Sequence, residues 1–365
     1  MAQGMAKRIH GACLIATPLA LSLLAAAALP QAGFAQTANA KSANAKSATA
    51  KAATAQTAAA QAAKTPAAKT QAAKTQAASP REKILVSADW VKAHAADKNL
   101  VLLQVGDQTT YDAGHIVGAR FLAMDGLSVS GVGDGALTLE VPAADDLRKQ
   151  LETLGLTDAS RIVVYLGAGM VPAATRIVFT LDAAGFGDRV VLLDGGLNEW
   201  RRAAYPTTTD VPEPKAGHLS PLKLTSRVVD ARFVQDHLRA PDYKVVDARA
   251  AMFYDGLAAG GTPAEKQPKG HIPGAISVPF TSITRSDQTL KSADELAAAF
   301  KAAGVASGDH LIVYCHVGWQ GTAVVFAARS LGVDAVLYDG SFQDWSHRGL
   351  PVEGPGAPKW PDAPK

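Results

Sequence analysis

Short apolar runs alternate with longer amphipathic stretches over most of the chain beyond residue 80. The runs predict buried strands at residues 101–103, 161–165, 190–193, 244–247, 310–314 and 335–338. Residues 292–304 predict an amphipathic helix with a serine cap and a glycine stop, and residues 321–332 predict a helix that is apolar on every side. Strands that alternate with helices predict an α/β fold, in which parallel sheets are covered by helices on both faces.

The chain also repeats itself. Three motifs recur in the same order: 114–120 returns at 270–276, 163–169 at 312–318, and 193–200 at 338–345. We therefore expect two copies of one domain, at residues 82–205 and 223–353. A proline-rich linker at 206–222 joins them, and a short tail follows at 354–365.

The N-terminal segment has the pattern of a secretory signal peptide at residues 1–35. Lys7 and Arg8 precede a short apolar run, and small residues stand at Gly33 and Ala35. Cleavage after Ala35 would send the protein across the inner membrane, so we expect a periplasmic protein without stable membrane insertion. An uncleaved anchor helix is the alternative.

Residues 36–80 contain little besides alanine, lysine, threonine, glutamine and serine. Such a segment has nothing with which to form a core, and it predicts a flexible linker. Contact of its six lysines with an anionic surface is a second interpretation.

Net charge argues against nucleic-acid binding. The formal net charge of the 365 residues is +3, but residues 1–80 hold eight basic residues and no acidic one. That leaves 28 of the 36 basic residues against all 33 acidic ones in the rest of the chain, a net charge of −5. A disulfide-stapled scaffold is excluded, because a bridge between the two cysteines, Cys13 and Cys315, would have to join the leader to the far end of the chain. We also expect no chelating metal site, because no second cysteine lies near Cys315.

Cys315 follows one buried strand and precedes one buried helix, with a loop at residues 315–320 between them. A short loop of this kind directs several backbone N–H groups toward a common centre, and the helix N-terminus adds positive potential. We expect this geometry to lower the pKa of the Cys315 thiol, and Gly318 to supply a tight turn. A buried structural cysteine is the alternative.

At these residues the sequence resembles the tandem-domain rhodaneses, a family of thiosulfate and 3-mercaptopyruvate sulfurtransferases. The matching motifs lie at residues 246–249, 270–275, 314–318 and 339–345. The resemblance implies two rhodanese-like domains and an enzyme that carries sulfur as a persulfide on Cys315. It implies thiosulfate as the small-molecule donor, with 3-mercaptopyruvate as the alternative, and cyanide or a thiol as the thiophilic acceptor. Backbone N–H groups can stabilise the persulfide without a metal or an organic cofactor.

The first copy lacks this chemistry. Leu166 stands where the second copy has Cys315, and Gln104 and Gly106 replace Asp247 and Arg249. We expect an inactive first domain that packs against the catalytic one and closes one side of its cleft.

The residues around Cys315 suggest how a donor is bound. Arg249 can either face the cleft and bind an anion or pair with Asp247. Well-known family members carry a second donor-binding arginine where this chain has Phe253. Lys266 or Lys269 can supply that charge, and the alternative is that both are exposed, solvated lysines.

Within the loop, substrate contacts are expected from His316, Val317, Gly318, Trp319 and Gln320. A basic residue directly after the cysteine is frequent in thiosulfate-using relatives, so His316 favours thiosulfate. Trp319 can form a wall over the donor or simply pack, and Gln320 replaces a frequent arginine. His271 recurs as His115 in the inactive copy, which predicts a structural role.

Two other functions compete with this interpretation. A related class of phosphatases uses a larger loop that ends in arginine, and here that position is Gly321, which cannot clamp a phosphate. The second alternative is a protein without enzymatic turnover. It would be a tethered binding module that senses persulfide or redox state through Cys315.

Overall fold

The computed structural model describes residues 78–262 and 266–355. All of them belong to one compact unit that spans residues 72–365. The expected signal peptide and nearly all of the expected linker at 36–80 lie outside the described residues. Within the described part of the chain, no helix has the length and apolar character needed to cross a bilayer.

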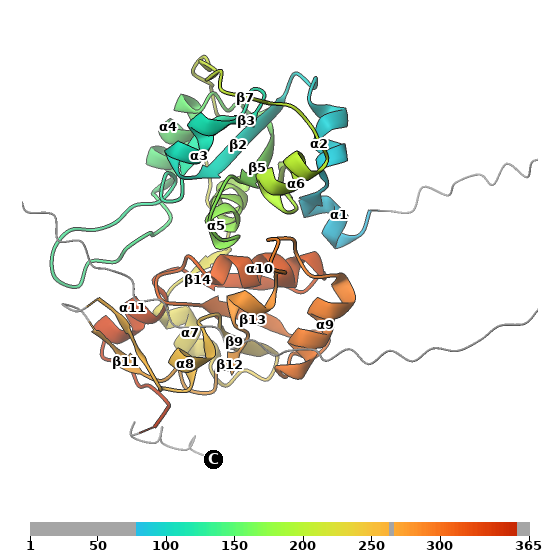
Figure 1. Ribbon diagram of the computed structural model, residues 1–365. Helices are drawn as coiled ribbons and strands as arrows, with labels where there is room; N and C mark the ends of the chain where they lie inside the picture. The colour runs from blue at the N-terminus through green and yellow to red at the C-terminus, as the bar shows by residue number, and fades with distance from the viewer. Residues whose placement is uncertain (1–77, 263–265, 356–365) are drawn as a thin grey trace, which may run out of the picture. The chain divides into compact units, whose positions relative to one another are not determined.

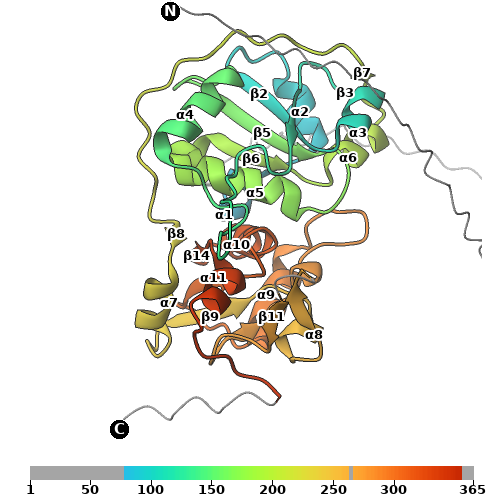
Figure 2. The same ribbon diagram turned by 90° about the vertical axis from the view of Figure 1, so that its left-hand side faces the viewer.

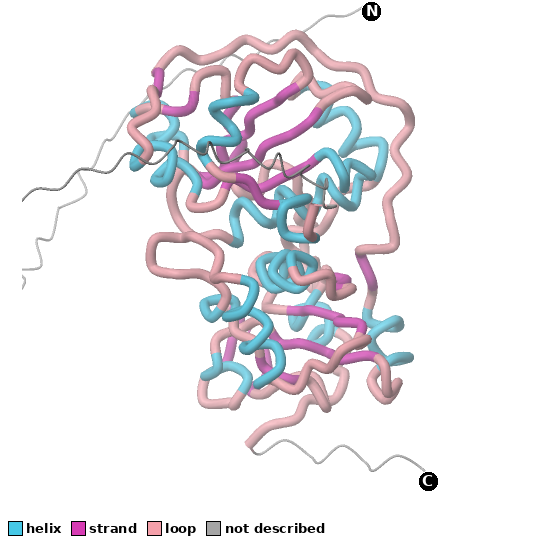
Figure 3. The backbone as a smooth tube through the Cα atoms, turned by 90° about the vertical axis from the view of Figure 1, so that its right-hand side faces the viewer, coloured by secondary structure: helices cyan, strands magenta, loops and turns pink. Residues whose placement is uncertain are grey.

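Each half of the described chain contains a parallel five-stranded sheet (Figures 1 and 3). In the first sheet the order is β1 (Leu85–Val86), β6 (Val190–Leu193), β5 (Arg161–Leu166), β2 (Leu100–Gly106) and β4 (Arg120–Ala123). In the second it is β12 (Ile276–Ser277), β9 (Tyr243–Asp247), β13 (His310–Tyr314), β14 (Ala335–Tyr338) and β8 (Val228–Val229). The fold class and all six predicted strands are confirmed.

Alternating side chains bury both faces of each sheet. On β13, Leu311 and Val313 pack with helices α9 (Ala293–Ala302) and α10 (Gly321–Ser330), while Ile312 and Tyr314 pack with α7 (Ala231–His237) and α11 (Ser341–His347). The first half is built alike, with α4 (Ala144–Thr153) and α5 (Pro172–Leu181) on one face and α2 (Ala88–His94) and α6 (Gly196–Arg202) on the other.

The remaining elements are short. They are α1 (Pro80–Ile84), α3 (Gln108–Ala113), β3 (His115–Ile116), η1 (Asp182–Phe186), η2 (Gly187–Arg189), β7 (Thr207–Thr208), α8 (Ala251–Tyr254), β10 (Ala259–Gly261), β11 (Lys266–Lys269) and η3 (Phe280–Ser282).

Helices α5 and α10 connect the halves, because their apolar side chains belong to the same core cluster. They face each other in Figures 1 and 2. Each half also reaches into the other with a loop: Val141 donates its N–H to Asp339 at 2.7 Å, and Leu290 donates its N–H to Asp194 at 2.8 Å. The two aspartates occupy equivalent positions in the repeat, so the exchange of hydrogen bonds is reciprocal.

Two short elements extend beyond the expected domain boundaries. Helix α1 begins at Pro80, inside the segment expected to be a linker, because Ser79 and Glu82 form a capping box there. Strand β7 lies inside the linker expected at 206–222, where Thr207 and Thr208 pair antiparallel with β3. Two-residue elements of polar composition leave no periodicity from which a sequence can predict them.

Candidate active site

Cys315 lies at the carboxyl end of β13, the central strand of the second sheet, and its side chain is fully buried. The loop that follows ends at Gly321, the first residue of α10. Backbone N–H groups of Gly321, Val317 and Gln320 hydrogen bond to the sulfur. The expected convergence of main-chain donors on one thiol is therefore present.

The expected lowering of the thiol pKa is wrong for this buried state. Burial raises the pKa of Cys315, because the thiolate is removed from water. The three N–H groups and the Ser341 hydroxyl act in the opposite direction without reversing the shift. The donors nevertheless offer a fixed, positively polarised site to any anionic sulfur that forms there.

A second segment encloses the cysteine from the other side. Ser341 accepts the N–H of Cys315 at 3.1 Å, and the N–H groups of Phe342 and Gln343 bond to the carbonyls of Cys315 and His316, both at 3.0 Å. Ser341 adopts φ 52°, a conformation that side-chain-bearing residues rarely adopt. Ser341 was not among the predicted site residues, although its turn belongs to a motif that recurs in both halves.

Gly318 meets the expectation of a tight turn. Its φ is +77°, and a Cβ at this position would lie 2.5 Å from the carbonyl oxygen of Asp339 and 2.8 Å from its Oδ1. No larger residue fits without moving the loop or the Asp339 turn.

Arg249 does not face the cleft, which corrects the anion-binding placement. Its side chain is fully buried, and Nη2 donates to Asp247 Oδ2 at 2.6 Å and to the Gly270 carbonyl at 2.7 Å. The ion pair with Asp247 is therefore the alternative that the structure adopts. Tyr314, fully buried beside it, donates its hydroxyl to the same Asp247 oxygen at 2.7 Å.

His316 brings no positive charge at neutral pH. Burial lowers its pKa to about 4, and the nearby Arg249 guanidinium contributes in the same direction. Its Nδ1 lies 2.9 Å from Oε1 of Gln267, and its ring stands edge-on to Phe253, with 4.6 Å between the ring centroids. The sequence favoured thiosulfate because His316 was expected to be basic. In the structure this side chain is neutral at physiological pH, so that argument for thiosulfate does not hold.

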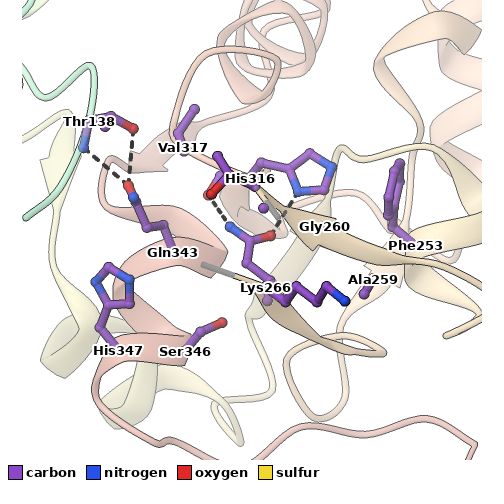
Figure 4. Close-up of a pocket in the computed structure, with 13 residues that line it drawn as sticks. Thr138, Phe253, Ala259, Gly260, Lys266, His316, Val317, Gln343, Ser346 and His347 are labelled. Carbon is purple, nitrogen blue, oxygen red and sulfur yellow. Dashed lines mark hydrogen bonds between the residues drawn. The ribbon is translucent and has the colours of Figure 1, made fainter. Parts of the chain in front are cut away.

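A cavity of about 420 Å³ opens beside the cysteine loop (Figure 4). It is lined by Thr138, Phe253, Ala259, Gly260, Gly261, Thr262, Lys266, Gln267, His316, Val317, Gln343, Ser346 and His347. Two of the five expected loop contacts, His316 and Val317, thus face it. Gly318, Trp319 and Gln320 do not line it; Trp319 packs against the core instead.

The first half contributes Thr138 to the lining of this cavity. Thr138 donates both its N–H and its hydroxyl to Gln343 Oε1, at 3.1 Å each (Figure 4). A role for the first half in closing one side of the cleft is consistent with this contact. Lys266 lines the same cavity, whereas Lys269 does not.

His271 and His115 have the same surroundings. Each ring stacks on a tyrosine, Tyr254 or Tyr111, and its Nδ1 lies within hydrogen-bond distance of that tyrosine's carbonyl, at 2.8 and 2.9 Å. This repeated arrangement agrees with a structural role for both.

The first half cannot hold a sulfur anion in the same way. Leu166 ends strand β5 at the position of Cys315, and α5 begins with Pro172 where α10 begins with Gly321. Proline has no N–H, so one of the three donors is missing as well as the nucleophile. Gln104 lies opposite Tyr165 as Asp247 lies opposite Tyr314, but its buried amide has no partner among the described residues.

The described residues contain no cluster of three or more histidine, cysteine or acidic side chains that could hold a metal ion. What the site offers is one nucleophilic sulfur, main-chain donors and a neighbouring cavity. This combination would allow a group to be carried covalently on Cys315.

Comparison with known proteins identifies the family. The model of the Rhodanese-like domain matches residues 87–203 and 230–348. A putative thiosulfate sulfurtransferase of Mycobacterium leprae is 31% identical, covering 75% of this chain and 98% of the relative. Thiosulfate/3-mercaptopyruvate sulfurtransferase 2 of Arabidopsis thaliana is 26% identical, covering 74% and 86%. The chain belongs to the rhodanese-like family and has two copies of its domain.

The solved structures show a similar fold. The anaerobic ergothioneine biosynthesis enzyme from Chlorobium limicola, in complex with trimethyl histidine, superposes with a TM-score of 0.67. It is 24% identical, and the match covers 76% of this chain and 71% of that one.

Proposed function

We propose that this protein is a sulfurtransferase that moves the outer sulfur of thiosulfate to a thiophilic acceptor through a persulfide on Cys315. The observation that carries the proposal is the Cys315 sulfur with the N–H groups of Val317, Gln320 and Gly321 bonded to it. The name of the relative from Mycobacterium leprae supports thiosulfate as the donor.

In the first step, the Cys315 thiolate attacks the outer sulfur of thiosulfate. A bond forms between the two sulfur atoms, the sulfur–sulfur bond of the donor breaks, and sulfite leaves with the electron pair. In the second step, cyanide or a thiolate attacks the terminal sulfur of the persulfide. Cys315 recovers its electron pair as thiolate, so no external oxidant or reductant is needed.

The main-chain donors act at both steps. They stabilise the attacking thiolate, which burial alone disfavours, and they then hold the anionic persulfide. Lys266 at the cavity wall is a cation that a thiosulfate dianion would approach.

3-Mercaptopyruvate is the second candidate donor. Relatives that use it frequently carry a small neutral residue after the cysteine. The pKa of His316, about 4, makes this side chain neutral at physiological pH, although it is not small. The name of the Arabidopsis thaliana relative includes both donors.

The test compares the two donors on the full-length protein, with cyanide as acceptor. Thiosulfate is expected to add about 32 Da to the protein, the mass of one sulfur atom, and to support thiocyanate formation. Cys315→Ser should abolish both, while the matched variant Cys13→Ser keeps both. Faster turnover with 3-mercaptopyruvate would overturn the donor assignment, and sulfur loading without turnover would indicate a sensor.

We also propose that the protein is exported to the periplasm, on the pattern of residues 1–35. Cell fractionation of the full-length protein tests this. Recovery in the cytoplasm with residues 1–35 still attached would contradict it.

A further inference from the structure

Arg176 is a fully buried arginine on α5, in the half that lacks the nucleophile. Its Nη1 pairs with Asp339 Oδ1 at 2.5 Å and lies 3.4 Å from the carbonyl oxygen of Gly318. Its Nη2 donates to the carbonyl of Leu139. Two of these three partners, Gly318 and Asp339, belong to the half that contains Cys315. Gly318 lies in the loop that begins at Cys315, and Asp339 lies in the turn that contains Ser341, which bonds to the N–H of Cys315.

The first partner, Gly318, lies inside the cysteine loop. Its carbonyl points toward Arg176. In a trans peptide the carbonyl and the next N–H point in opposite directions, so this contact fixes the orientation of the Gly318–Trp319 peptide. A carbonyl turned toward the sulfur would repel a thiolate or a persulfide anion. Arg176 therefore holds the Gly318 carbonyl away from the sulfur, to which the N–H groups of Val317, Gln320 and Gly321 bond.

The second partner, Asp339, precedes the segment that encloses Cys315 on its other side. Its Oδ1 pairs with Arg176, and its Oδ2 accepts the N–H of Val141. Two residues further on, Ser341 bonds to the N–H of Cys315. One guanidinium thus contacts both chain segments that bond to the cysteine.

We propose that Arg176, supplied by the catalytically inactive half, is a positioning residue for sulfur transfer at Cys315. It holds the Gly318 peptide and the Asp339 turn in the arrangement that accommodates an anionic sulfur. This inference rests on the proposed function, because the anion concerned is the thiolate or persulfide of Cys315. The inactive copy thereby contributes to the reaction without touching the substrate.

A purely structural role makes a different prediction, and the chain offers a matched control. Arg329 of α10 pairs with Asp182 of η1 at 2.5 Å, so this ion pair also joins the two halves. Neither residue has a hydrogen bond or ion pair with residues 315–320 among the contacts of the described chain. Loss of Arg329 therefore weakens the contact between the halves without disturbing the cysteine loop.

The experiment compares Arg176→Gln, Arg176→Lys and Arg329→Gln in a Cys13→Ser background. Steady-state assays with thiosulfate and cyanide give kcat and KM, and thermal unfolding gives Tm. We expect Arg176→Gln to lower kcat by about 10- to 100-fold with KM changed less than about threefold, since misplacement of catalytic groups has effects of this size. Arg176→Lys should recover part of the loss, and Arg329→Gln should lower Tm but keep kcat within about twofold.

Alkylation of Cys315 by iodoacetamide gives a readout that requires no sulfur donor. Arg176→Gln should slow alkylation at neutral pH by about tenfold relative to Arg329→Gln. Equal alkylation rates and equal kcat values in the two variants would overturn the positioning role. If Arg176→Gln does not fold, Arg176→Lys is used to test the positioning role. A kcat and an alkylation rate of Arg176→Lys equal to those of the unsubstituted protein would then overturn the proposal. If the unsubstituted protein gains no sulfur, the proposed function fails, and alkylation still tests the positioning role.

Discussion

The Ser341 hydroxyl accepts the backbone N–H of Cys315 at 3.1 Å and donates to the carbonyl of Tyr338 at 2.8 Å. When the hydroxyl turns its single proton from the Tyr338 carbonyl to the Cys315 sulfur, that bond lowers the pKa of the thiol, against the larger effect of burial. One hydroxyl therefore links the turn after β14 to Cys315, the residue after β13. The two segments meet because β13 and β14 are neighbours in the sheet.

Ser341→Ala should raise the pKa of Cys315 further. Below that pKa less thiolate is present, so we expect alkylation at neutral pH to slow by up to about tenfold, the equivalent of one hydrogen bond of about 1.4 kcal/mol. The difference should close at a pH above the thiol pKa. Ser330→Ala is the control, since that buried hydroxyl donates to the Ala327 carbonyl instead and does not line the cavity. Equal rates in the two variants would argue against the Ser341 contact.

Glu140 should make the stability of the protein pH-dependent. Burial raises its pKa to about 8, with repulsion from Asp339 and Asp344 adding to the shift and Arg176 opposing it. Between about pH 4.5 and pH 8 the folded state binds more protons here than the unfolded state, so this contribution to stability is lost as the pH rises.

Glu140→Gln removes this proton linkage. We expect its Tm to exceed that of the unsubstituted protein at about pH 8 and the difference to shrink toward about pH 4.5. Glu213→Gln, at an exposed position, should show no such trend. A constant difference in Tm across this range would contradict the linkage.

The two buried tyrosines at equivalent positions should differ in their contribution to stability. Tyr314 donates to Asp247 and accepts the N–H of Ile272 at 3.0 Å, whereas Tyr165 accepts the N–H of Ile116 at 3.1 Å and faces Gln104. Tyr314→Phe leaves a buried carboxylate with one donor fewer.

We therefore expect Tyr314→Phe to reduce the free energy of unfolding by about 2–3 kcal/mol and Tyr165→Phe by about 1 kcal/mol. Urea denaturation monitored by tryptophan fluorescence measures both. Equal losses would mean that the bond to Asp247 adds nothing.

Restoring the missing nucleophile should not by itself restore full activity to the first half. Leu166→Cys in a chain that carries Cys13→Ser and Cys315→Ser should gain sulfur from thiosulfate at least several-fold more slowly than the unsubstituted protein, because Pro172 has no N–H to offer. Adding Pro172→Gly supplies that donor and should raise the alkylation rate of the introduced thiol several-fold, by roughly the effect of one hydrogen bond. Mass spectrometry after incubation with thiosulfate checks the first expectation. Loading of the Leu166→Cys chain at the rate of the unsubstituted protein would contradict it.

Much of the fold could be predicted because buried parallel strands are continuous apolar runs. β13 and β5 are examples, and the repeated motifs placed them at equivalent positions. Edge strands such as β1 and β12 consist of two residues, too short for any periodicity. Their positions depend on the strands beside them.

The candidate site likewise contains some residues that the sequence predicts and others that it does not. Cys315 and Gly318 were recognisable because loop chemistry depends on neighbours in the chain. Arg176 was not, because its contact with Asp339 spans 163 residues and arises only when α5 packs on α10. The neutral state of His316 also depends on tertiary structure, since burial causes it.

The reciprocal hydrogen bonds of Asp339 and Asp194 have a consequence for how such proteins evolve. Each copy has an aspartate that accepts a backbone N–H of the other copy. Loss of either copy would remove the backbone N–H group that bonds to the aspartate of the other copy. Exchange of single copies between relatives should therefore fail more often than exchange of the whole pair.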